Sequence, residues 1–151
     1  MIKSLQEKES FLILKNNYIG NLGYVFQNKP FIAPITYFYD EEKNCIICYS
    51  NEGHKITAMR KNNNVSLEVS EISSVNKWQS ALVQGTFEEL KGSEATAYLH
   101  DFSLGVKDLI MRKEVRKLDY INEFSSKIYA DDMPIVYLIK VEEITGRMRR
   151  N

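Results

Sequence analysis

PFIAPITYFYDEEKNCIICYSNEGHK, residues 30–55, contains two apolar segments and the turn that follows them, and this stretch decides the fold. The segments 31–39 and 45–50 are rich in aromatic and β-branched residues, which favour strands. A further strand is predicted at 19–26, before the turn signal Asn28-Lys29-Pro30. Because the connections between these three strands are too short for a crossover, we expect an antiparallel meander.

The rest of the chain supplies further predicted strands and helices. Strands are predicted at 65–69, 78–90, 135–139 and 141–148. Helices are predicted at 54–62, 93–102, 119–129 and 4–16, where the helix opens on the capping-box sequence Ser4-Leu5-Gln6-Glu7. Residues 105–117 have mixed helical character. Six or seven strands at this spacing predict a mainly β fold, a closed β-barrel with peripheral helices.

The composition is that of one domain without a strong overall charge. The 151 residues are 44% hydrophobic, and 20 Lys and Arg balance 20 Asp and Glu. Such a balance does not favour nucleic acid or an acidic membrane as a partner, so any anion site must be local. Lys3, Glu7 and Lys8 exclude the apolar core of a signal peptide, and no apolar run approaches the ~20 residues of a membrane span. We predict a single cytoplasmic domain over residues 1–151.

Cys45 and Cys48 raise the question of a metal site. Residues three apart on a strand point to opposite faces, so these two thiols cannot bind one ion together. We interpret them as small apolar side chains rather than zinc ligands, and we predict no metal site. Two thiols also make no disulfide framework, which is typical of proteins in a reducing cytoplasm.

Three polar side chains gather where the helix at 54–62 begins. His54 and Lys55 lie next to the partial positive charge of unpaired backbone N–H groups, which is unfavourable for a cation unless an anion binds there. Together with the Ser50 hydroxyl, these groups match a phosphate site. The alternative is a solvated turn whose side chains touch nothing.

Pro34 falls inside a predicted strand, where it cannot donate a hydrogen bond to a neighbour. That strand must therefore lie at a sheet edge or carry a bulge. Either arrangement frees backbone groups of Ile35 and Thr36 for a ligand, and Tyr37 could offer its ring or hydroxyl. Edge protection against aggregation is the alternative reason for this proline.

Trp78, Ser80 and Gln84 share one face of a predicted strand. An aromatic ring beside a hydroxyl suits a planar ligand, although a lone Trp at the start of a strand is also typical of a core or a dimer interface. Gly85 allows this strand to bend, as a small barrel requires. The chain has no Gly-x-Gly-x-x-Gly motif and no P-loop, so a glycine-rich nucleotide loop is not expected.

A series of short motifs shares the order and spacing of one known family. The motifs are Tyr39-Asp40, Tyr49-Ser50, Gly53-His54-Lys55, Met59-Arg60-Lys61-Asn62, Val65-Ser66-Leu67-Glu68-Val69, Trp78-Gln79-Ser80 and Gly85-Thr86-Phe87-Glu88-Glu89-Leu90. They resemble the FMN-binding split-barrel family, in the pyridoxamine 5'-phosphate oxidase-related branch that includes nitroimidazole-resistance reductases. The resemblance implies a six-stranded split barrel that forms a homodimer, with two FMN sites between the subunits.

The resemblance also implies roles for individual residues. Backbone along the flavin ring would come from Pro34, Ile35, Thr36 and Tyr37. The phosphate of FMN would be held by Tyr49, Ser50, His54 and Lys55. The residues near the isoalloxazine, across the dimer interface, would be Trp78 and Ser80. No catalytic side chain is expected, because flavin hydride transfer does not require one.

The chain departs from the oxidases themselves in several places. It has His54-Lys55 where they place Arg-Lys, and their C-terminal substrate-binding tail is not recognisable. We therefore favour an FMN-dependent oxidoreductase that passes electrons from NAD(P)H to a small acceptor, such as a nitroaromatic. The alternatives are a non-catalytic flavin- or haem-binding protein, with His54 or His100 as the haem ligand, and a structural dimer without a ligand.

Overall fold

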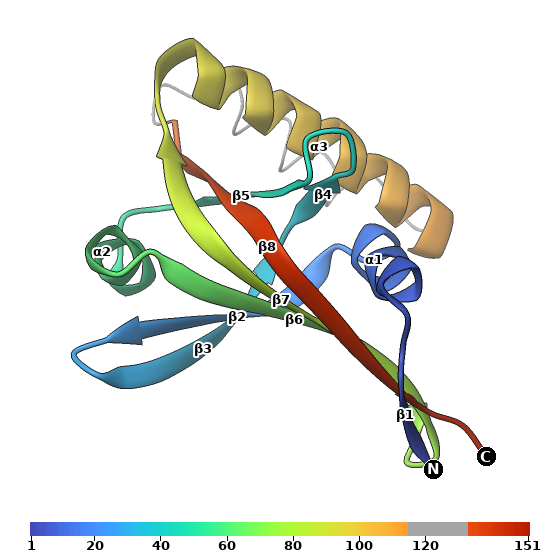
Figure 1. Cartoon of the computed structure of the whole chain (residues 1–151). Helices are drawn as coiled ribbons and strands as arrows, with labels where there is room; N and C mark the ends of the chain where they lie inside the picture. Colours follow the sequence, from blue (N-terminus) through green and yellow to red (C-terminus); the bar gives the residue numbers. More distant parts are fainter. Residues whose placement is uncertain (115–132) are drawn as a thin grey trace.

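The computed structural model describes residues 1–114 and 133–151, and this part of the chain is mainly β (Figure 1). Its helices are α1 Glu7–Lys15, α2 His54–Lys61 and α3 Gly92–Glu114. Its strands are β1 Ile2–Ser4, β2 Ile19–Phe26, β3 Lys29–Thr36, β4 Phe38–Asp40, β5 Cys45–Ser50, β6 Asn64–Ser74, β7 Lys77–Leu90 and β8 Ile135–Arg149. The helix predicted at 119–129 lies outside the described residues.

The strands pair antiparallel in the order β3-β2-β6-β7-β8-β5-β4, and β1 pairs with β8. The segment predicted as one strand at 31–39 forms two strands. Its first part, β3, pairs with β2, whereas β4 pairs with β5 at the other end of the order. The chain thus passes from one edge of the sheet to the other at Tyr37. The architecture is the split barrel with peripheral helices that the sequence predicted.

The described residues contain eight strands, so the expected number of six is wrong. One additional strand is β1, and the other results from the break at Tyr37. The Tyr37 backbone N–H donates to the Tyr18 carbonyl at 2.8 Å, and its hydroxyl donates to the Leu14 carbonyl at 2.7 Å. These partners lie far back in the sequence, so the run of aromatic residues carries no local sign of the break.

Two apolar clusters hold the fold together, one on each face of β5. Ile46 and Cys48 belong to the cluster inside the barrel, whereas Cys45 and Ile47 pack beneath α3. Figure 1 shows α3 lying across β5 and the start of β8. Burial of both faces explains why β5 is a continuous apolar run rather than an alternating one. The two thiols accordingly lie on opposite faces of the strand.

The long strands β7 and β8 bend where their register shifts. Gln84 pairs with Glu143 and Gly85 pairs with Val141, so Glu142 is the extra residue of a β-bulge. A Cβ atom at position 85 would clash with the Lys140 carbonyl. The predicted bend at Gly85 is therefore confirmed, and the region 135–149 is one bent strand rather than two.

The helix boundaries differ from the predicted ones at two places. Helix α1 begins at Glu7 rather than at Ser4, and the backbone N–H of Gln6 donates to the Glu9 carboxylate at 3.1 Å. Ser4 instead pairs with Arg147 in β1. Helix α3 continues beyond Phe102 to Glu114 because its apolar side chains stay buried over that length. Among the described residues, no helix has the length and apolar character to cross a bilayer.

Candidate functional site

The edge of β3 is open along the part of the chain that the structure describes. β3 has β2 as its single partner strand there, with Pro34 opposite Asn21. Alternate backbone N–H and C=O groups of an edge strand have no ladder partner. The expectation that Pro34 marks an edge is confirmed, and the exposed edge runs through the residues that were predicted to follow a flavin ring.

Helix α2 follows β5 after a loop of three residues, and its first turn is uncapped. Its N-cap residue Gly53 is extended, and no described side chain caps this end. The first N–H groups of a helix lack intrahelical partners, so those of His54 and Lys55 face outward with a partial positive charge. An anion near this end would be stabilised by both the N–H groups and the dipole.

Lys55 is half-buried in the first turn of α2. Burial raises the pKa of the Cys48 thiol to about 12, and the nearby Lys55 ammonium acts in the opposite direction. Ser50 lies two residues beyond Cys48 and therefore on the same face of β5. Its hydroxyl donates to the Asn51 carbonyl at 3.0 Å. Ser50 and Lys55 therefore flank the loop at 51–53, one at the end of β5 and the other in the first turn of α2.

The His54 imidazole is held by three aromatic rings, an arrangement that the sequence analysis missed. Its Nδ1 atom lies 3.1 Å from the Tyr24 hydroxyl. The ring centroids of Phe26 and Phe31 lie 4.9 and 4.8 Å from that of His54, both edge-on. The alternation of Tyr24 and Phe26 on β2 was a usable signal, but the strand alone does not say which residue they meet. The β2–β3 hairpin therefore orients His54.

Arg60 links α2 to the loop that precedes it and to strand β7. Its Nε donates to Glu89 at 2.7 Å, and its two terminal nitrogens donate to Glu52 at 3.0 and 2.9 Å. The hydrogen bond from Arg60 lowers the pKa of the Glu89 carboxyl below its ordinary value. Sequence reasoning named Arg60 within a motif and gave it no role, because Glu89 lies 29 residues away.

Two of the predicted tyrosines are turned away from the exposed β3 edge and the turn. The Tyr37 side chain is fully buried, and its hydroxyl is used by the Leu14 carbonyl. The expectation that Tyr37 offers its ring or hydroxyl is therefore wrong, because packing against α1 occupies both. Tyr49 packs edge-on against Phe102 of α3 at 5.2 Å, on the face of β5 opposite Ser50.

Trp78 and Ser80 belong to the start of β7, and Figure 1 shows the turn between β6 and β7 far from α2. Ser66 pairs with Gly23 next to the His54 rings, whereas Ile72 pairs with Trp78. The six residue steps between Ser66 and Ile72 span roughly 20 Å at about 3.3 Å per step. One chain therefore does not bring all the predicted flavin-contacting residues together.

Comparison with known proteins places this architecture in a family. The family model for pyridoxamine 5'-phosphate oxidase matches residues 6–148. The chain belongs to the pyridoxamine 5'-phosphate oxidase family. An uncharacterised protein of Rhizobium meliloti is 26% identical over 148 residues, which cover 97% of this chain and 94% of that protein.

Solved structures share the fold of this family member. A FAD-binding protein from Mesorhizobium loti superimposes with a TM-score of 0.76 at 22% identity, covering 100% of this chain and 98% of the other. A FAD- and haem-binding protein from Mycobacterium smegmatis gives 0.67 at 13% identity, covering 99% and 74%. Both likenesses span the whole split barrel.

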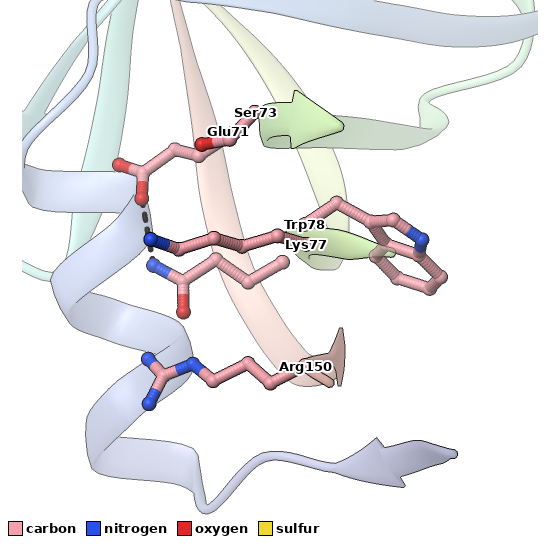
Figure 2. A pocket seen from close by; sticks show the side chains of 6 residues that line it. Glu71, Ser73, Lys77, Trp78 and Arg150 are labelled. Atoms are coloured by element: carbon pink, nitrogen blue, oxygen red, sulfur yellow. Dashed lines mark hydrogen bonds between the residues drawn. The ribbon is translucent and has the colours of Figure 1, made fainter. Parts of the chain in front are cut away.

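This member of the pyridoxamine 5'-phosphate oxidase family also has a small cavity of about 120 Å³ at the tip of the β6–β7 hairpin. Figure 2 shows the polar ends of Glu71, Lys77 and Arg150 on one side of the hairpin, with the Trp78 indole pointing away from them. Glu71 accepts hydrogen bonds from Gln79 at 2.6 Å and from Asn17 at 2.8 Å. The Trp78 ring therefore belongs to the opposite face of the sheet.

That opposite face, which we call the outer sheet face, carries several exposed apolar side chains among polar ones. Strand pairing places Ile72 and Leu82 on the same face as Trp78, and Ile32 on the same face of the neighbouring hairpin. Ile32 and Ile72 are 77% and 73% exposed. Large apolar side chains with this exposure make the face a candidate interaction surface.

Proposed function

We propose that this chain is an FMN-binding oxidoreductase of the pyridoxamine 5'-phosphate oxidase family, transferring electrons from NAD(P)H to a small acceptor such as a nitroaromatic. The observation that supports it most is the uncapped start of α2, where Lys55 follows His54 and the His54 ring packs against Phe31 of the edge strand β3. The donors and charges of this site match a phosphate, and the strand edge matches a planar heterocycle.

Each part of the site has a physical task in binding. The Lys55 ammonium and the first N–H groups of α2 would offset the charge of a phosphate, with the His54 ring held beside them by Tyr24. Backbone N–H and C=O groups of the β3 edge would pair with the polar rim of a flavin ring. When bound, FMN would supply the chemistry, since a flavin accepts hydride from a reduced nicotinamide and passes electrons on.

We further propose that the complete site needs a second copy of the chain. Trp78 and Ser80 of the partner subunit would complete it, since within one chain they lie roughly 20 Å from the His54 end. The charges on the outer sheet face would suit pairing with a second copy. Arg147 lies opposite Ser80 on this face, whereas Glu143 lies opposite Gln84, so a two-fold arrangement would bring opposite charges together.

The decisive experiment is an FMN titration followed by absorption and fluorescence, on the wild-type protein and on Lys55→Ala. We expect the variant to lose about ten- to hundredfold in affinity, because a charge-assisted hydrogen bond contributes about 1.5–3 kcal/mol. Lys15→Ala, which removes an exposed lysine paired with Glu41, is the matched control and should bind as wild type. A wild-type protein that ignores FMN and does not oxidise NAD(P)H in its presence would refute the proposal.

Haem binding without turnover is the second candidate. Both histidines of the chain, His54 and His100, are exposed, and imidazole is a common axial ligand of haem. A Soret band in the purified protein that His54→Ala or His100→Ala removes would favour this candidate, whereas flavin bands would favour the first.

A further inference from the structure

Arg60 makes four hydrogen bonds that join three segments around the start of α2. It binds both carboxylate oxygens of Glu52, and both oxygens of Glu89 at 2.7 and 3.0 Å. Glu52 belongs to the loop between β5 and α2, and Glu89 belongs to β7. The two-pronged geometry uses the planar fork of the guanidinium, which a lysine does not have.

The loop at 51–53 has little else to hold it. All three of its residues are exposed, and a Cβ atom at Gly53 would meet only the Asn51 carbonyl, at 4.0 Å. The Ser50 hydroxyl binds the Asn51 carbonyl at the β5 end of the loop. At the α2 end, Glu52 immediately precedes the turn, and its contact with Arg60 connects that turn to the rigid ladder of β7 and β8.

We propose that Arg60 is a positioning residue for phosphate binding, acting through Glu52. It holds the loop so that the first N–H groups of α2 and the Lys55 ammonium face one point in space. This inference rests on the proposed flavin function and adds a residue that never touches the ligand. Pre-ordering of this kind raises affinity, since binding then does not have to order the loop.

Simple electrostatics predicts the opposite effect for Glu52, which makes the idea testable. A carboxylate beside an anion site should weaken binding, so its removal should raise the affinity for FMN. Positioning through the Arg60–Glu52 pair predicts that its removal lowers the affinity. The sign of the Glu52→Ala effect therefore separates the two interpretations.

The experiment compares FMN with riboflavin, which lacks the phosphate, by fluorescence titration of wild type, Arg60→Lys, Glu52→Ala and the double variant. We expect each single variant to lose about two- to fivefold in FMN affinity, the range for a partly exposed ion pair, and the double variant to lose no more. Riboflavin affinity should stay within about twofold of wild type, since the Arg60–Glu52 pair acts on phosphate binding only. Arg112→Lys, in the exposed pair with Asp108 on α3, is the matched control.

Hydrogen exchange of residues 51–56 in the ligand-free variants provides a second measurement, and it should be faster than in wild type. Equal or tighter FMN binding by Glu52→Ala would overturn the inference. So would a parallel loss of riboflavin binding, which would show a general effect on the fold. If the wild-type protein does not bind FMN, the proposed function fails as well, whereas wild-type binding with unaffected variants refutes only the role of Arg60.

Discussion

The α2 end of the barrel and the tip of the β6–β7 hairpin are built in opposite ways. At the α2 end, side chains from five segments contact one another: His54 meets three rings of β2 and β3, and Arg60 joins a loop to β7. At the tip, Ile72 and Val75 are 73% and 77% exposed. The first region is completed by its own chain, whereas the second presents apolar surface to its surroundings.

This difference indicates how the two halves of the proposed site depend on assembly. Groups that bind a phosphate need fixed positions, and intrachain contacts fix them before any ligand or partner arrives. An exposed apolar face gains stability only when something covers it. We therefore expect substitutions at the α2 end to change folding and those at the tip to change association.

The largest effect on stability should come from the buried face of α2. Met59 is fully buried there, and Met59→Ala should lower the free energy of unfolding by about 2–5 kcal/mol through lost burial and a residual cavity. Urea unfolding measures this change. Met111→Ala, at a position 59% exposed on α3, is the matched control and should stay within about 0.5 kcal/mol of wild type. A small loss of unfolding free energy in Met59→Ala would mean that α2 is not tightly packed within its own chain.

An intermediate effect is expected at the outer sheet face. Ile72→Asp should weaken self-association by at least about tenfold, because burial of an unpaired charge costs more than about 1.4 kcal/mol. Sedimentation velocity over a concentration series measures the dissociation constant. Leu104→Asp, at a position 54% exposed on α3, should leave association unchanged. If Ile72→Asp associates as tightly as wild type, the dimer contact lies elsewhere.

The smallest effect should be the pH dependence of the Arg60–Glu89 pair. The hydrogen bond from Arg60 lowers the Glu89 pKa from its ordinary value of 4.5, so the unfolded chain holds this proton more tightly than the native protein. The stability from the pair is therefore present above pH 4.5 and is lost as the pH falls through the lower, folded-state pKa.

Glu89→Gln should accordingly flatten the acid side of the stability curve below pH 4.5, by less than about 1 kcal/mol because the pair is partly exposed. Urea unfolding at a series of pH values measures the slope. Arg60→Gln removes the donor of the same bond and should flatten the curve equally. An unchanged slope in both variants would show that the pair does not fix the turn to β7.

Local chemistry explains which parts of the fold could be predicted from the sequence. Strand β2, strand β5 and helix α2 follow from hydrophobic patterning and turn residues within a few positions, and the structure confirms them. Pro34 and Gly85 were read correctly as an edge and a bend because each has a backbone constraint of its own. The predicted start of α1 at Ser4 was wrong, because Ser4 pairs with β8 instead of capping a helix.

The candidate site was predictable in part for the same reason. Ser50, His54 and Lys55 all lie within residues 50–55, so their placement around the start of α2 is a local property. The packing of the rings around His54 is not a local property, since Tyr24 lies 30 residues away in the sequence. Trp78 and Ser80 lie roughly 20 Å from this turn in the same chain, a separation that spacing within the sequence does not encode.

The sequence by itself determined a mainly β chain with short turns, a basic helix start after β5, and the family to which these motifs belong. The tertiary structure alone decided that the second predicted strand divides at Tyr37, that three rings hold His54, and that Arg60 ties the loop to β7. The physical reason is the separation in sequence over which each kind of interaction acts. Patterning and turn chemistry act within a few residues, whereas these three features depend on hydrogen bonds and ring contacts between segments that meet only in the folded barrel.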